Sequence, residues 1–92
     1  MKRTLWWVLA GSRGGANRAD IIRALRERPY NAHQLAEAVG LDYKTVRHHL
    51  KVLSENQVVV SEGKNYGAMW FLSTQMEQHY DDFLQILQQV RG

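Results

Sequence analysis

The fold is decided by residues 31–53, which read NAHQLAEAVGLDYKTVRHHLKVL. Asn31 with Gln34 fits a capping box, in which each side chain bonds the backbone N–H of the other residue at a helix start. Apolar residues then recur at helical spacing until Gly40, and glycine commonly follows the last turn of a helix. Asp42 can cap a new helix only two residues later. The stretch therefore predicts two short helices joined by a tight turn.

The second of these helices is predicted to have one apolar face and one basic face. Val46, Leu50 and Leu53 recur at intervals of four and three, which places them on one side, toward the core. The other side carries a basic and polar set with no acidic residue before Glu55: Tyr43, Lys44, Thr45, Arg47, His48 and Lys51. The pair is a helix-turn-helix pattern with a cationic outer surface.

Further elements are expected on both sides of this pair. A first helix is predicted from Asn17, its expected cap, to Arg28-Pro29, because proline disfavours a helical residue before it. Residues 58–60 and 69–72 are β-branched, aromatic or apolar runs around a turn, which predicts a hairpin. Thr74 with Glu77 fits another capping box, so a last helix is expected to continue to about Val90. The expected fold class is mainly α with a small β-hairpin, an α+β winged helix-turn-helix.

Over residues 17–72 the chain resembles the ArsR-type winged helix-turn-helix transcriptional regulators. The resemblance depends on Gln34-Leu35-Ala36, Gly40-Leu41, Thr45-Val46-Arg47-His48-His49-Leu50 and Val52-Leu53, followed by the hairpin. It implies a dimeric transcription regulator whose third main helix enters the major groove of DNA. It also implies that the hairpin, or wing, touches the adjacent DNA backbone or minor groove.

The chain departs from the metal-sensing members of that family. Those members carry paired cysteines in the first helix of the turn motif, whereas this chain has no cysteine. Thiolate-based metal sensing is therefore excluded, and the chain is more similar to small cysteine-free archaeal members. No metal and no cofactor are expected. A surface site of His79 and Asp82, shared with a dimer mate, stays open as an alternative.

The basic face supplies the candidate DNA contacts. Arg47 is the first choice to contact base edges, because arginine on guanine is the commonest specific pairing in the major groove. Thr45 and His48 are candidates for a base or a phosphate. Phosphate contacts are expected from Tyr43, Lys44 and Lys51 on the helix, and phosphate or minor-groove contacts from Lys64, Asn65 and Tyr66 at the hairpin tip. The alternatives are a solvated basic face and, for Tyr66, packing within the hairpin.

The two ends of the chain are expected to form a dimer interface. The last helix has an a/d heptad seam over two heptads, made of Met76, Tyr80, Phe83, Leu87 and Val90, and Leu84 widens its apolar surface. Leu5, Trp6 and Trp7 belong to a short N-terminal helix that is expected to join the interface, because two adjacent tryptophans cannot both point inward. The alternative is that the last helix packs only on its own core.

Composition is consistent with one small DNA-binding domain. A chain of 92 residues with 45% hydrophobic residues can bury one modest core. We expect an apolar segment and linker at 1–15, the winged-helix core at 16–72 and a dimerisation helix at 73–92. Residues 1–55 hold ten basic against five acidic residues, which is where an acidic partner is expected. No apolar run approaches the roughly 20 residues that span a membrane, so a cytoplasmic protein is expected.

Together with the resemblance, these patterns predict a sequence-specific regulator of double-stranded DNA, a repressor that acts as a homodimer on a pseudo-palindromic site. Two rivals remain open: a winged-helix module that binds another protein, and a nonspecific chromosome-associated DNA-binding protein. An enzyme is not expected, because no nucleophilic triad or carboxylate pair falls on elements that would converge. The sequence does not identify an effector.

Overall fold

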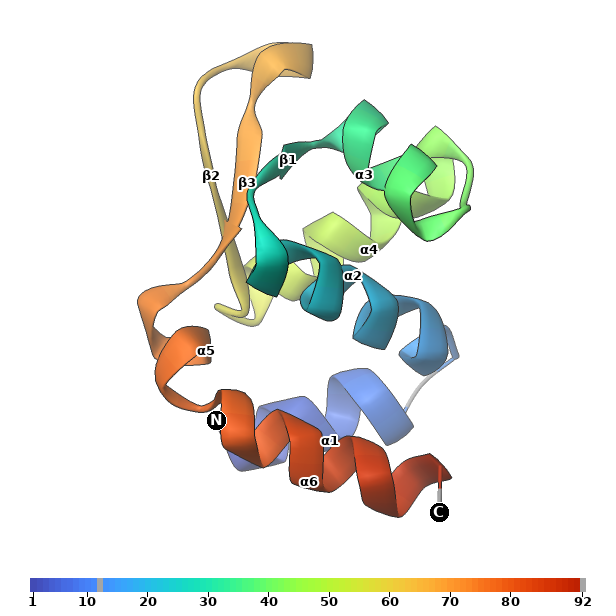
Figure 1. Ribbon diagram of the computed structural model, residues 1–92, viewed down its shortest axis with the longest axis vertical. Helices are drawn as coiled ribbons and strands as arrows, with labels where there is room; N and C mark the ends of the chain where they lie inside the picture. The colour runs from blue at the N-terminus through green and yellow to red at the C-terminus, as the bar shows by residue number, and fades with distance from the viewer. Residues whose placement is uncertain (12, 92) are drawn as a thin grey trace.

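The structure is a computed structural model that describes residues 1–11 and 13–91, apart from the side chains of Tyr66 and Arg91. Its elements in chain order are α1 (Lys2–Ala10), α2 (Gly15–Glu27), β1 (Tyr30–Asn31), α3 (Ala32–Val39), α4 (Tyr43–Glu55), β2 (Val59–Glu62), a 3-10 helix (Asn65–Gly67), β3 (Met69–Leu72), α5 (Thr74–Gln78) and α6 (Tyr80–Arg91). The expected winged-helix class is confirmed (Figure 1). Within the described residues, no helix combines the length and the apolar character needed to cross a bilayer.

The β2–β3 hairpin belongs to a three-stranded antiparallel sheet in the order β1-β3-β2. β2 pairs with β3 from Val59 opposite Leu72 to Glu62 opposite Met69. The third strand, β1, has only two residues, and its Asn31 lies opposite Met69. A strand this short has no periodic pattern, so the sequence analysis found the hairpin and missed β1.

The predicted ends of the helix-turn-helix are confirmed. The Asn31 side chain accepts a hydrogen bond of 2.8 Å from the Gln34 N–H, and the Gln34 side chain accepts one of 3.0 Å from the Asn31 N–H. Gly40 takes the left-handed conformation, with φ of 72°, immediately after α3. Asp42 then caps α4. The turn is set by local hydrogen bonds between neighbouring residues, which is why sequence spacing predicted it.

The predicted start of the first main helix at Asn17 is wrong, because α2 begins at Gly15. Gly15 is buried against α1, where a Cβ atom would overlap the backbone carbonyl of Leu9. The position therefore requires glycine, and α2 begins where the chain packs back against α1. Gly15 lies four residues before the buried Ala19, so the helical spacing of the buried face already indicated that the helix extends back to Gly15.

The predicted last helix is also wrong in two respects. Its cap is Ser73 rather than Thr74: the Ser73 Oγ accepts a hydrogen bond of 3.0 Å from the Met76 N–H and donates one of 2.7 Å to the Gln57 carbonyl. The helix is interrupted at His79, which separates α5 from α6. The interruption redirects the chain so that α6 lies beside α1 at the end of the molecule opposite the hairpin (Figure 1).

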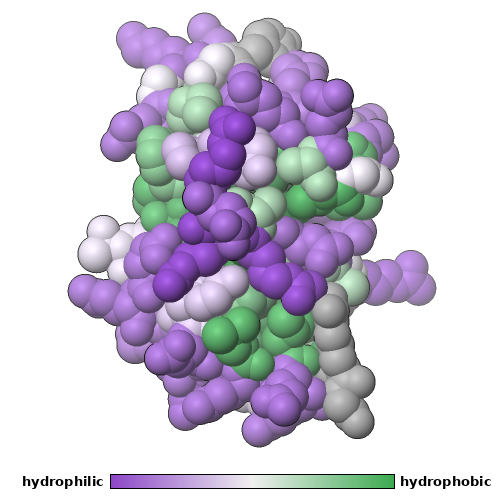
Figure 2. Space-filling model, in the orientation of Figure 1, coloured by the Kyte–Doolittle hydropathy of each residue, from purple (hydrophilic) through white to green (hydrophobic). Residues whose placement is uncertain are grey.

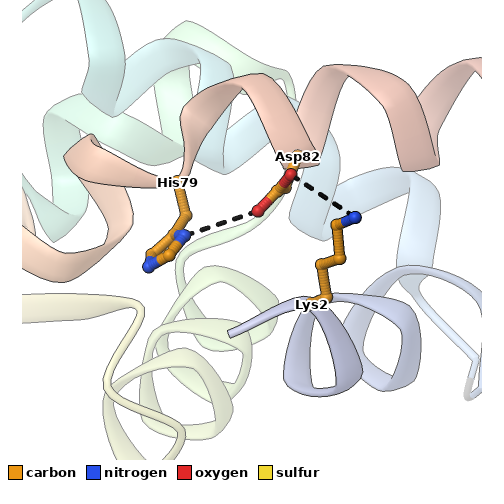
Figure 3. A network of polar contacts seen from close by, with 3 residues as sticks. All are labelled: Lys2, His79 and Asp82. Atoms are coloured by element: carbon orange, nitrogen blue, oxygen red, sulfur yellow. Dashed lines mark hydrogen bonds and ion pairs between the residues drawn. The ribbon is translucent and has the colours of Figure 1, made fainter.

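A polar network at this break links α6 to α1. The Nδ1 atom of His79 lies 3.4 Å from one carboxylate oxygen of Asp82, and the other oxygen lies 3.9 Å from the Lys2 ammonium (Figure 3). Lys2 comes from the first turn of α1, and Asp82 from the first turn of α6. Lys2 is exposed, so its ion pair with Asp82 contributes little to stability.

Half of the predicted dimer-interface residues belong to the core of the chain itself. Leu5, Met76 and Phe83 are fully buried, Leu87 is 8% exposed, and Tyr80 is half-buried. The prediction that Leu5, Met76, Phe83 and Leu87 meet a partner is therefore wrong, because all four side chains are buried in the core of the chain itself. The exposed apolar side chains of the two helices are Trp6, Trp7, Leu84 and Val90. Figure 2 shows apolar surface in the lower half of this face, where α6 lies.

A buried arginine joins three segments. Arg18 on α2 is 2% exposed, and its guanidinium donates to the Val8 carbonyl at 2.7 Å and to the Arg13 carbonyl at 2.9 Å. A third N–H lies 3.2 Å from the Nδ1 atom of His49 on α4. An arginine only donates, so this ring nitrogen must accept and His49 must be neutral. Burial lowers the pKa of His49 below its ordinary value of 6.5, and the Arg18 and His48 charges lower it further.

Of the two asparagines predicted to cap helices, Asn31 caps α3 and Asn17 does not cap α2, so their substitutions should affect stability differently. We expect Asn31→Ala to lower the free energy of unfolding by about 1 kcal/mol, because the side-chain oxygen that accepts from the Gln34 N–H is lost, whereas the backbone N–H that donates to Gln34 remains. The matched control Asn17→Ala lies inside α2 and is expected to change the free energy of unfolding by less than about 0.5 kcal/mol. Urea denaturation followed by circular dichroism measures both. Equal losses in the two variants would contradict the assigned helix starts.

The neutral His49 makes stability depend on pH. Since the folded state lowers the pKa of His49, the unfolded chain binds a proton first as pH falls below about 6.5. The free energy of unfolding is therefore fully retained above that pH and declines below it. The decline arises because a protonated His49 would place a second positive charge beside the Arg18 guanidinium. We expect His49→Gln to flatten the decline between about pH 7 and pH 5, and His48→Gln to keep most of it. A decline as steep in His49→Gln as in the original chain would refute this assignment.

Candidate nucleic-acid interface

Helix α4 presents its basic side chains to solvent. Its inward face is formed by Val46, His49, Leu50 and Leu53, which are all buried. Lys44, Arg47, His48 and Lys51 are all exposed on the other face. In the part of the chain that the structure describes, the ion pairs involve Lys2, Arg23, Arg26 and His79, and none of the α4 cations. The face is therefore a set of cations available to an external anion.

Thr45, one of the predicted contact residues, has a structural partner at the start of α4. The Asp42 carboxylate accepts hydrogen bonds of 2.8 Å from both the Thr45 N–H and the Thr45 hydroxyl. These bonds hold the pKa of Asp42 below its ordinary value of 3.8. The Thr45 hydroxyl proton is thus committed to Asp42, so Thr45 can offer an outside partner only an acceptor or its methyl group.

The Tyr43 ring joins the two helices of the motif. It stacks on the ring of His33, at the start of α3, with centroids 4.1 Å apart and planes inclined by 16°. Tyr43 is half-buried as a result. Its edge also borders a hollow of about 450 Å³, together with Arg47 of α4 and Asn65 and Ala68 of the wing. The structure therefore brings Tyr43, Arg47 and Asn65 together around one hollow.

A second hollow lies between α4 and β3, and we call it the Trp70 groove. Its volume is about 480 Å³, and its lining residues are Lys44, Arg47, His48, Lys51, Ser54, Glu55 and Trp70. Arg47 borders both hollows, so it lies where the helix and the wing meet. The sequence analysis missed Trp70, Ser54 and Glu55. Helical spacing alone placed Ser54 on the Arg47–Lys51 side, but Trp70 could be found only from the strand register.

The wing tip carries the remaining predicted contacts. Lys64 and Asn65 are exposed. Positive φ angles of 96° at Gly63 and 59° at Asn65 turn the chain here, a conformation that glycine and asparagine tolerate best. The side chain of Tyr66, the third predicted residue, lies outside the described residues. DNA contact by the wing stays a prediction.

The helix-turn-helix matches a known family. Residues 16–60 match the model of the family described as "Bacterial regulatory protein, arsR family", which confirms the resemblance seen in the motifs. The matched range extends from the first turns of α2 into β2, so it contains the whole basic face of α4. No curated protein matches the chain.

Solved structures share the fold at low sequence identity. A homodimeric winged helix-turn-helix DNA-binding domain from Mycobacterium bovis, described as a possible ArsR-family regulator, has a TM-score of 0.74 at 15% identity, covering 95% of this chain and 77% of that one. The Mycobacterium tuberculosis protein Rv0081 has a TM-score of 0.73 at 21% identity, covering 97% and 87%. A Staphylococcus aureus MarR protein has a TM-score of 0.68 at 18% identity, covering 82% of this chain. The chain spans only 53% of the MarR protein's length.

Proposed function

Because residues 16–60 carry the helix-turn-helix of the ArsR family of bacterial regulatory proteins, we propose that this chain regulates transcription by binding specific sites in double-stranded DNA. The observation that carries the proposal is the unpaired basic face of α4, exposed beside the wing. A major groove is wide enough to admit one α-helix. Three permanent cations on one side of that helix match the phosphates on both rims of the groove.

Each side chain has a proposed role that its position supports. Arg47 contacts a base edge, since it lies at the centre of the face, between the helix and the wing. Lys44 and Lys51 contact phosphates on either side, and His48 contacts a base or a phosphate. Tyr43, Thr45, Lys64, Asn65 and Tyr66 complete the proposed interface. Thr45 contributes through its methyl group or as an acceptor, because its proton is bonded to Asp42.

We further propose that the chain is a single domain that acts as a homodimer and a cytoplasmic repressor. Trp6, Trp7, Leu84 and Val90 are each 40% exposed or more, on the neighbouring helices α1 and α6. Large apolar side chains gathered on one end are typical of an interface. Two copies joined there present two α4 helices to half-sites about 34 Å apart on a pseudo-palindrome. Occupation of such a site blocks the transcription machinery.

The DNA contacts can be tested by fluorescence anisotropy with a duplex selected from random sequences. We expect the Kd of the original chain to rise steeply with salt. Lys51→Ala should weaken all sequences alike and lower the salt slope by about one, whereas Arg47→Ala should lose about 1–3 kcal/mol of preference at one base position. Arg3→Ala removes an exposed cation from α1 and serves as the control.

The rival functions give different results in the same experiment. Absence of duplex binding at low salt would favour a module that binds another protein. Binding without any preferred sequence in the selection would favour a nonspecific chromosome-associated protein. Either result would refute sequence-specific regulation.

The dimer can be tested by analytical ultracentrifugation. We expect the original chain to sediment as a dimer and Leu84→Glu to sediment as a monomer, because a carboxylate would be buried between two apolar surfaces. Val60→Glu is the matched control, since Val60 and Leu84 are both 46% exposed and Val60 lies on the wing. A monomeric original chain, or equal dissociation in both variants, would contradict the proposed interface.

A further inference from the structure

The Trp70 groove contains a buried donor that the fold leaves unpaired. Trp70 is 8% exposed, and its indole N–H has no hydrogen-bond acceptor. Among the described residues, this is the single buried side-chain nitrogen or oxygen without a partner. A tryptophan N–H can only donate, and buried donors in proteins are nearly always paired. The described chain therefore leaves one buried donor of a groove-lining residue without an acceptor.

The walls of the groove define the chemistry of that acceptor. Lys44, Arg47 and Lys51 contribute three positive charges, against the single carboxylate of Glu55. An anion is therefore favoured over a neutral or cationic ligand. The Trp70 ring adds an aromatic wall, held in place because β3 pairs with β1 and β2 on its two sides. A ligand with a planar apolar part can pack against this ring.

We propose that the Trp70 groove binds a small planar organic anion, an aromatic carboxylate, which occupies the basic face of α4 and thereby excludes DNA. The volume of about 480 Å³ lies within the range of small-molecule sites, roughly 300–1,000 Å³. The ring packs against Trp70 and the carboxylate pairs with Arg47 and Lys51. The indole N–H is covered, so the carboxylate reaches it when the flexible stems of the lining lysines and arginine move aside.

A free ligand fits the groove better than a phosphate of the DNA backbone. A phosphate that stays in a duplex contacts the exposed charged ends of the α4 side chains, whereas the unpaired N–H is buried and out of reach of a group held at the surface. Binding of the anion does not require the proposed DNA function, but its effect on DNA does. Because Arg47 and Lys51 would serve both partners, the two would bind in competition.

Anion binding can be followed at the tryptophan itself. The probe is naphthoate, titrated into the full chain while the indole N–H resonances are recorded in a proton–nitrogen NMR spectrum. The chain has three tryptophans, and Trp70→Phe identifies the resonance of interest. We expect the Trp70 resonance to move and saturate, while those of Trp6 and Trp7 on the distant end stay in place. The neutral counterpart, naphthalenemethanol, should bind at least tenfold more weakly.

Matched variants separate the groove from other basic sites. Arg47→Gln should raise the Kd for naphthoate about tenfold, because one charge-assisted hydrogen bond to the carboxylate is lost. Arg3→Gln makes the same change on α1 and should leave the Kd within about twofold. Equal affinity for naphthoate and its neutral counterpart, an unmoved Trp70 resonance, or an equal response to inorganic phosphate would overturn the proposal.

The effect on DNA completes the test. With the selected duplex, naphthoate should raise the apparent Kd for DNA in proportion to its occupancy of the groove. DNA binding that is unaffected at saturating naphthoate would overturn the proposed exclusion. A Trp70 response in a chain that binds no DNA would refute the proposed regulator and leave the anion site standing, so the two failures are distinguishable.

Discussion

The arrangement of the helices depends on one buried guanidinium. A charge taken out of water is costly unless its donors are bonded, and Arg18 bonds the carbonyls of Val8 and Arg13 and the ring of His49. These partners come from α1, from the connector and from α4. The guanidinium therefore holds α1 against the body of the molecule, and α1 in turn covers the apolar seam of α6. Without it, the orientation of α4 relative to the two end helices would lose its main polar constraint.

The parts of the fold that were predictable are those set by near neighbours. Asn31, Gly40 and Asp42 act through bonds to residues three or four positions away, and the structure has all three where spacing placed them. Gly15 and Ser73 depend on Leu9 and Gln57, which lie in other segments of the chain. The heptad seam was a real pattern, but a helix from the same chain covers most of it.

The candidate site also has features that local sequence spacing predicts and features that depend on contacts between elements. Helical periodicity alone predicted that Lys44, Arg47, His48 and Lys51 point outward. It could not show that the Thr45 hydroxyl bonds Asp42, or that the Tyr43 ring stacks on His33. The contribution of Trp70 depends on how β3 is placed against α4, which no local pattern determines. Sequence therefore predicts the charge of the surface, whereas the structure adds its hollows and its unpaired donor.

The position of Asn31 has a mechanical consequence. The same residue is the last of β1, opposite Met69 in the sheet, and the cap of α3. The wing and the helix-turn-helix are thus joined at one residue, without any linker. In the proposed complex, this joint limits changes in the span between the wing contacts and the α4 contacts, so a duplex that bends or changes its groove width fits more readily. Sequences that deform easily would then be preferred even at positions that no side chain touches.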